Sequence, residues 1–122
     1  ERAKAVLNPR QLSRHADAGG VAAALLSDSG TIYTGVCIDT SSSMGFCAEH
    51  AAAAALITAG ESHVLRMIAV HWDGQIIPPC GRCREFISQL DDRNAETEVM
   101  VSSDVRLSLS ELLPFDWRKA VD

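Results

Sequence analysis

Residues 47–60 read CAEHAAAAALITAG, and residues 64–70 read VLRMIAV. Alanine is the strongest helix former, and Gly60 stands where the end of a helix favours glycine, so the first stretch predicts a helix. The second stretch is apolar apart from Arg66, which is typical of a strand that is covered on both faces of its sheet. A helix that leads into such a strand indicates an α/β fold.

The segment before this helix predicts a helix end and a β-hairpin. Residues 1–7 are expected to end a helix, because the Asn8-Pro9 pair that follows disfavours helical geometry. The glycines at 19–20 are expected to break the chain ahead of the hairpin. Its two strands are predicted at 21–26 and 31–38, on either side of residues with turn chemistry.

The segment after residue 70 predicts one more helix and two short strands. Residues 82–90 place Phe86, Ile87 and Leu90 at helical spacing, and residues 97–101 and 105–109 have strand character. We therefore expect a three-layer α/β/α fold with a mixed five-stranded sheet, formed by a single domain over residues 1–122.

The composition excludes several classes of protein. The chain has 122 residues, 47% of them hydrophobic and 22% charged, with a net charge of -5. An acidic balance argues against a nucleic acid polymer as partner, because such proteins carry a basic excess. The longest apolar run, at 51–57, is too short to span a membrane, and no basic-then-apolar leader opens the chain. These features predict a cytoplasmic location.

Three of the four cysteines stand at predicted helix starts. Cys47 precedes the alanine-rich helix, and Cys80 and Cys83 lie in the first turn of the next helix. Residues three apart share a helix face, so Cys80 and Cys83 can reach one point in space. Helix N-termini carry partial positive charge, which favours thiolates. Two such ends directed at one spot would suit a zinc ion held by sulfur.

Glu49 distinguishes a catalytic site from a structural one. Three protein ligands leave zinc a fourth position for water, which is typical of catalytic zinc. A carboxylate next to that water can accept its proton and later return it. An acid two residues after Cys47 can share the cavity only if the metal lies off the end of the helix, which a position in the first turn allows.

The two cysteine motifs follow the form [HC]-x-E…P-C-x-x-C, at residues 47–49 and 79–83, which is the signature of zinc-dependent nucleobase deaminases. Over residues 21–117 the chain resembles the cytidine deaminase family. PCGRCR at 79–84 and ELLP at 111–114 are similar to the small tetrameric cytidine deaminases and to blasticidin S deaminase.

The resemblance implies a cytidine deaminase-like fold with one Zn2+ per chain, held by Cys47, Cys80 and Cys83. It implies hydrolytic deamination of a cytosine nucleoside, cytidine or deoxycytidine, or of a cytosine-containing analogue, to the uracil form with release of ammonia. It also implies a role in pyrimidine salvage and a homotetramer, or a dimer. Blasticidin S deaminase, which gives antibiotic resistance, is the alternative enzyme.

The resemblance also assigns roles around the base. Glu49 would move protons from the attacking water to the pyrimidine N3 and then to the departing amino group. The Ala48 backbone N–H and the Pro78 carbonyl occupy positions that contact the base edge in the family. Because a main-chain carbonyl survives the change to proline, Pro78 is compatible with that contact.

Two departures from the family pattern concern the substrate. Cys37 and Asp39 occupy the positions at which cytidine deaminases carry Asn and Glu to hold the ribose hydroxyls. Asp39 can still accept a sugar hydroxyl, whereas Cys37 is a poor substitute for an amide. Gly19 occupies the position of the aromatic residue that stacks on the base. The substrate-binding part of the pocket is therefore expected to be altered.

The charge of the site needs compensation. Zinc with three thiolates carries a net charge of -1, so a positive group is expected to offset it. Relatives with three cysteines carry Arg directly after the catalytic Glu, whereas this chain has His50. We expect Arg82, Arg84 or a protonated His50 to hydrogen-bond the ligand sulfurs.

Two other interpretations of the cysteines stay open at this point. Cys37 as a fourth thiolate would close the metal site and make it a structural zinc in a non-catalytic domain. The CxxC alone would also fit a thioredoxin-like redox protein. The structural zinc leaves Glu49 and Pro79 without a reason, and a redox CxxC normally occurs in a chain without a third cysteine at a helix start.

Overall fold

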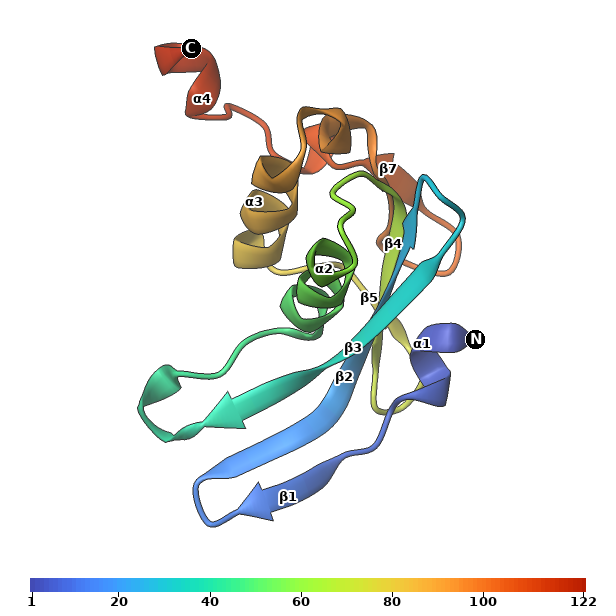
Figure 1. Ribbon diagram of the computed structural model, residues 1–122, viewed down its shortest axis with the longest axis vertical. Coiled ribbons are helices and arrows are strands. Elements are labelled where there is room, and N and C mark those ends of the chain that lie inside the picture. Colours follow the sequence, from blue (N-terminus) through green and yellow to red (C-terminus); the bar gives the residue numbers. More distant parts are fainter.

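In the computed structural model, which describes residues 1–122, seven strands form one mixed sheet with helices on both of its faces (Figure 1). In chain order the elements are α1 (Arg2–Ala5), β1 (Arg10–Ser13), β2 (Ala16–Ser27), β3 (Ile32–Thr40), the 3-10 turn η1 (Ser41–Ser43), α2 (Ala48–Thr58), β4 (Val64–His71), β5 (Ile76–Ile77), α3 (Gly81–Leu90), η2 (Asp92–Glu96), β6 (Glu98–Met100), β7 (Arg106–Ser108), η3 (Ser110–Leu112) and α4 (Arg118–Val121).

Strand β2 organises the sheet because both of its edges are paired along its length. One edge pairs antiparallel with β3, as in Ala22 with Val36. The other edge pairs first with β1 and then antiparallel with β4, as in Leu25 with Met67. Strand β4 then pairs in parallel with β6, and β6 pairs antiparallel with β7. The predicted mixed α/β class is confirmed.

The sheet has seven strands rather than the predicted five. The five predicted strands are present, and the short strands β1 and β5 extend the edges of β2 and β4. All four residues of β1 are exposed, so β1 lacks the apolar alternation that marks a strand in a sequence. Strand β5 has only two residues. Pairing with a longer neighbour makes both segments strands.

The sequence led us to expect that the glycines at positions 19 and 20 break the chain, but they do not. Strand β2 runs through both of them, with a register shift between Ala18 and Ala22. Gly19 has a positive φ of 84°, and a Cβ there would lie 2.0 Å from the Asn8 carbonyl oxygen. The glycine therefore makes a bulge that bends β2 against residue 8 instead of ending it.

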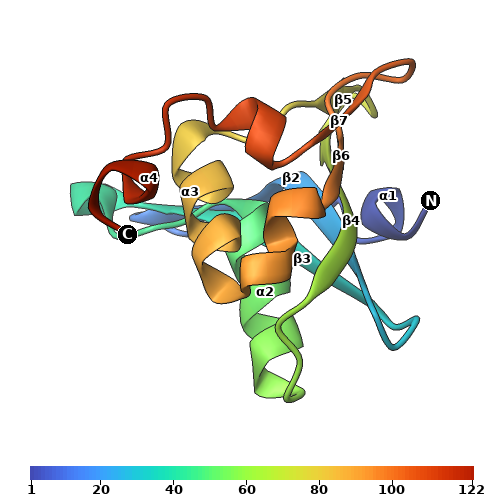
Figure 2. The same ribbon diagram turned by 90° about the horizontal axis from the view of Figure 1, so that it is seen from above.

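The helices cover the two faces unequally. Helices α2 and α3 lie on one face and the four-residue α1 on the other (Figures 1 and 2). The larger apolar core lies under α2 and α3 and includes Leu25, Leu56 and Ile87. On the α1 side, Val70 and Ile68 of β4 pack with Ala3 of α1, whereas Leu65, near the start of β4, is 39% exposed. Both faces of β4 therefore contribute to a buried cluster, but the cover is incomplete at Leu65, because so short a helix as α1 screens little of the sheet.

Small residues let α2 approach the sheet closely. A Cβ on Gly35 of β3 would lie 2.4 Å from the backbone nitrogen of Ala52. Ala48, Ala52 and Ala53 are fully buried on this side of α2. The alanine run therefore places the first turn of α2 directly against β3, and the start of that helix carries the motif residues.

The helices of the structure include no candidate membrane span. None of them is both long enough and apolar enough to cross a bilayer.

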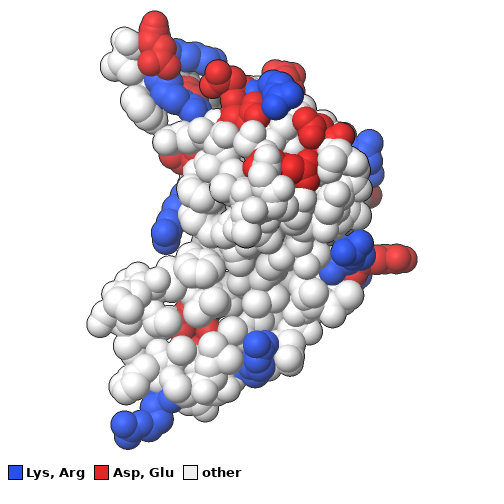
Figure 3. All heavy atoms as spheres, viewed as in Figure 1, with Lys and Arg blue, Asp and Glu red and all other residues white.

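Charged side chains gather over the end formed by α3, β7 and α4, whereas the surface around the hollow beside α2 is mostly uncharged (Figure 3).

Candidate functional site

The cysteines stand at the N-terminal tips of two helices. Cys47 is the N-cap of α2 and Cys80 is the N-cap of α3, each with an extended backbone conformation. Cys83 lies in the first turn of α3 and is fully buried. The two positive helix ends converge on one point and favour negative charge there, against the cost of burying a thiolate.

The three sulfurs form one cluster. Their Sγ atoms all lie within 4.8 Å of one another. Cys80 Sγ lies 3.5 Å from Cys47 Sγ and 3.5 Å from Cys83 Sγ. Tertiary packing therefore brings together residues that are 33 positions apart in the chain.

This arrangement fits zinc. Tetrahedral zinc with Zn–S bonds of about 2.3 Å would place its sulfur ligands about 3.8 Å apart. The observed separations of 3.5 Å require only a small expansion. In the protein without metal, burial is the main cause that raises the pKa of the Cys83 thiol, with the Glu49 charge next. A divalent cation would offset both effects, because it favours the thiolate.

Cys37 does not belong to this cluster. The group of possible metal ligands within reach of one another comprises Cys47, Cys80 and Cys83. Cys37 Sγ instead accepts a hydrogen bond from the Val21 backbone nitrogen at 3.3 Å, and it lies 4.0 Å from Asp39 Oδ2. The geometry argues against a fourth thiolate ligand and leaves the cluster open on the side of the cavity.

Glu49 lies in the first turn of α2 and is 4% exposed. It lines the same cavity as Cys47 and Cys80. Burial raises the pKa of its carboxyl above the ordinary value. A carboxyl whose pKa is raised towards neutrality exchanges protons more readily at physiological pH, which is what general acid–base chemistry requires.

The three candidates for charge compensation occupy different places. His50 Nδ1 lies 3.4 Å from Cys83 Sγ, and its ring stacks on Phe86 with a centroid distance of 4.2 Å. Burial, together with the Arg82 charge, lowers the pKa of His50. The structure thus places His50 against a sulfur in an environment that favours the neutral ring, which can still donate a hydrogen bond from Nδ1.

The two arginines do not make the same contact. Arg84 donates from Nε to the Pro79 carbonyl at 2.8 Å and from a terminal nitrogen to the Leu112 carbonyl at 3.5 Å. It therefore hydrogen-bonds the backbone of the segment that precedes Cys80, rather than a ligand sulfur. Arg82 is exposed and lines the cavity.

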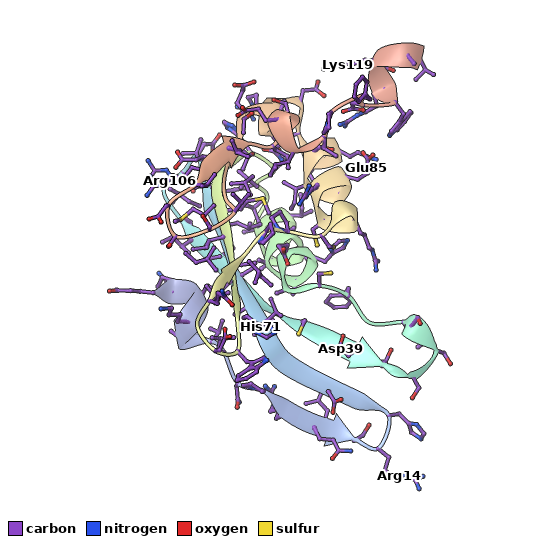
Figure 4. The ribbon with its side chains drawn as sticks, turned by 180° about the vertical axis from the view of Figure 1, so that it is seen from behind. Arg14, Asp39, His71, Glu85, Arg106 and Lys119 are labelled. Atoms are coloured by element: carbon purple, nitrogen blue, oxygen red, sulfur yellow. The ribbon has the colours of Figure 1, made fainter.

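A cavity of about 410 Å3 opens next to the sulfur cluster. It is lined by residues from β2, β3, the two helix starts and the segment before α3, namely Val21, Cys37, Asp39, Gly45, Phe46, Cys47, Ala48, Glu49, Ile77, Pro78, Cys80 and Arg82. All four residues that the sequence assigned to substrate binding are among them. Figure 4 shows Asp39 on β3 and Arg14 at the turn between β1 and β2.

Sequence reasoning missed one conspicuous lining residue, Phe46. It lies next to Cys47 in the chain, and that adjacency is the only signal that pointed to it. Gly19, the position at which a stacking aromatic was sought, does not line the cavity. The bulge turns its backbone against Asn8 instead.

Comparisons with known proteins agree on one family. The cytidine deaminase of Mycobacterium tuberculosis is 33% identical over 96 residues, which are 77% of this chain and 69% of that protein. The cytidine deaminase of Halalkalibacterium halodurans is 32% identical over 99 residues, covering 77% of this chain and 74% of that protein. No family model matches the sequence.

Solved structures give the same result for the fold. The crystal structure of the M. tuberculosis cytidine deaminase matches with a TM-score of 0.77 at 29% identity, over 93% of this chain and 89% of that chain. The cytidine deaminase of Mycobacterium leprae matches with a TM-score of 0.77 at 25% identity, over 93% of this chain and 92% of that chain. The likeness extends over nearly the whole chain.

Proposed function

The chain belongs to the cytidine deaminase family of hydrolases, and on this premise we propose that it converts a cytosine nucleoside to the uracil form with release of ammonia. Cys47, Cys80 and Cys83 hold one Zn2+ per chain in this proposal, and Glu49 moves the protons. Residues 1–122 act as one catalytic domain.

One observation carries the proposal. Three sulfurs from two helix tips lie within 4.8 Å of one another, and the buried Glu49 lines the cavity into which this cluster opens. A structural zinc site would need a fourth protein ligand and would have no use for a buried carboxylate. A thioredoxin-like redox protein would need neither Cys47 nor Glu49.

The reaction adds water across C4 of the ring and expels the amino group. Zinc, when bound, polarises the water and lowers its pKa. Glu49 accepts a proton from the attacking water as the water oxygen bonds to C4, and it donates this proton to N3. Glu49 then carries the second proton to the amino group, the C4–N bond breaks, and ammonia leaves behind a C4 carbonyl. The raised pKa of Glu49 supports both the accepting and the donating step.

The base edge is held by main-chain groups in this proposal. Ala48 and Pro78 both line the cavity, which supports the assignment of the Ala48 N–H and the Pro78 carbonyl as base contacts. Asp39 borders it from β3 and is available to a hydroxyl of the sugar, with Cys37 beside it.

His50 is the favoured partner of the thiolates. Its Nδ1 lies 3.4 Å from Cys83 Sγ, a contact that Arg84 does not make. A hydrogen bond to a thiolate spreads its charge, and the Arg82 side chain adds positive charge at the mouth of the cavity. Both features support a three-thiolate centre with compensated charge.

Ammonia release from a panel of compounds tests the reaction and its substrate. The zinc-loaded protein is incubated with cytidine, deoxycytidine, cytosine and blasticidin S. We expect release from the two nucleosides. Turnover of blasticidin S alone would favour the antibiotic-resistance alternative, which the Cys37 and Asp39 departures support. No release from any of the four would contradict the proposed function.

Zinc content of two cysteine variants tests the ligand set. Cys83→Ala should lose the metal, because a site of three ligands is reduced to two. Cys37→Ala removes a thiol outside the cluster and should retain one zinc per chain, measured by atomic absorption after gel filtration. Loss of zinc in Cys37→Ala would favour the closed four-thiolate site.

We extend the proposal to a cytoplasmic homotetramer, or a dimer, with a role in pyrimidine salvage. Ile57 on the outer side of α2 and Leu65 on β4 are 43% and 39% exposed, which leaves apolar surface for other subunits. Light scattering should give four times, or twice, the 13.1 kDa of one chain. A monomer at working concentration would exclude both assemblies.

A further inference from the structure

Phe46 is the only aromatic side chain among the lining residues of the cavity. It directly precedes Cys47, and both residues line this cavity. It is 37% exposed, although a phenyl ring gains by leaving water. Phe86, by contrast, already stacks on His50. Phe46 is therefore the one aromatic residue that lines the cavity, and part of its surface is uncovered.

The backbone of Phe46 is fixed. Its N–H donates to the Ile38 carbonyl at 2.8 Å, and its carbonyl accepts from the Ile38 N–H at 3.0 Å. Gly45 permits this approach, because a Cβ there would lie 1.9 Å from the Ile38 carbonyl oxygen. Residues 37 and 39, on either side of Ile38, line the same cavity. The backbone that carries the ring is thus fixed against β3, next to Cys47.

The sugar end of the cavity is poor in hydrogen-bonding side chains. Apart from the sulfur cluster and Glu49, its polar lining side chains are Asp39 and Arg82, with no Asn, Gln, Ser or Thr among them. The Cys37 sulfur is already occupied by the Val21 N–H. A sugar bound here meets few groups of this chain that read its hydroxyls.

We infer that Phe46 stacks on the pyrimidine ring and that this chain selects its substrate by the ring rather than by the group on N1. The inference rests on the proposed function, since it concerns the same cavity. The flat π face of a phenyl ring matches a heteroaromatic base and is indifferent to the sugar. The substrate class is then 4-aminopyrimidines with varied N1 substituents.

Steady-state kinetics of Phe46 variants test the stacking. Phe46→Leu keeps an apolar side chain without the π face and should raise KM for cytidine about ten-fold, with kcat changed less. Phe46→Tyr keeps the ring and should stay close to the wild-type KM. Trp72→Leu, which removes an exposed aromatic outside the cavity, is the matched control. A Leu variant with wild-type KM, or a Tyr variant as impaired as Leu, would overturn the inference.

The choice of N1 substituent tests the second half of the inference. A site built to hydrogen-bond a substrate hydroxyl rejects the analogue without it by roughly 10^4-fold. We expect cytidine and 1-methylcytosine, which lacks every sugar hydroxyl, to differ far less in kcat/KM with the wild-type protein, and Phe46→Leu to impair both equally. A wild-type preference of that full size would show that the sugar is read closely after all.

A binding measurement separates failure of this inference from failure of the proposed function. Phe46→Trp introduces an indole at the cavity, and uridine, the reaction product, should quench its fluorescence beyond the quenching seen in wild type. Zinc content is measured in the same samples. Quenching without turnover in zinc-loaded protein would remove the deaminase function and keep the stacking. Turnover without added quenching would remove the stacking and keep the deaminase function.

Discussion

The layer formed by α2 and α3 buries one polar side chain at each of its two ends. The two side chains differ in the partners that surround them. At the C-terminal end, Asn94 of η2 is fully buried. It accepts a hydrogen bond from the Val64 N–H at 2.8 Å and donates to the Ser62 and Ile87 carbonyls at 3.1 and 2.9 Å. At the N-terminal end, Glu49 lines a cavity beside three thiols.

The difference distinguishes a polar group that holds the fold from one that does chemistry. Asn94 joins the end of α3 to the start of β4, and all three of its partners are groups of the same chain, so burial costs it little. Glu49 is placed where burial disfavours its charge and raises its pKa. A protein accepts that cost where a reacting molecule supplies the missing partner.

The largest expected effect is the loss of kcat when Glu49, at the N-terminal end of the layer, is replaced. Glu49→Gln keeps the shape of the side chain but cannot accept a proton, so kcat for ammonia release should fall about 10^3-fold. Glu85→Gln, an acid on α3 outside the cavity, should leave the rate unchanged.

Stability and metal content complete the Glu49 test. Because the raised pKa means that the charged carboxylate opposes folding at neutral pH, Glu49→Gln should not lower the free energy of unfolding. The variant should also retain zinc. A Glu49→Gln protein with undiminished turnover would remove the chemical role from this end of the layer.

The structural end should respond in the opposite way. Asn94→Ala leaves the Val64 N–H and the Ser62 and Ile87 carbonyls without partners in the core, which should cost about 3 kcal/mol of unfolding free energy in urea titrations. Asn94→Asp can still accept from Val64 but cannot donate while ionised, so it should also be destabilised. The kcat of the folded fraction should be unchanged, and a selective loss of kcat would blur the division between the two ends.

The smallest expected effect concerns the exposed edge of the same C-terminal network. Asp91 accepts hydrogen bonds from the Arg93 guanidinium and backbone and from the Ser62 hydroxyl, and these bonds hold its pKa below the ordinary value. A depressed carboxyl pKa adds stability above the pKa of the unfolded state, and this stability is lost as pH falls. Asp91→Asn should cost about 1 kcal/mol or less at pH 7.

Urea titrations at several pH values test the sign. The difference between wild type and Asp91→Asn should be constant at neutral pH and shrink below about pH 4, where the Asp91 carboxyl of the unfolded chain takes up a proton while the native one is still charged. A difference that grows as pH falls would show that Asp91 is not stabilised as an anion.

The sequence by itself determined the helix over residues 48–58, the five principal strands and the motif residues at the helix starts, because local propensity and periodicity encode each of them. Cys47-x-Glu49 and Cys80-x-x-Cys83 are local patterns of this kind, so their chemistry was readable before the fold was known.

Tertiary structure alone decided what depends on distant partners. The edge strands β1 and β5 exist through pairing with β2 and β4, and the Gly19 bulge forms against Asn8. The same holds for three contacts between residues that are far apart in the sequence. They are the contact of His50 with Cys83, the place of Phe46 in the cavity and the three hydrogen bonds of Asn94. Such contacts depend on how whole elements pack, and no local pattern of residues carries that information.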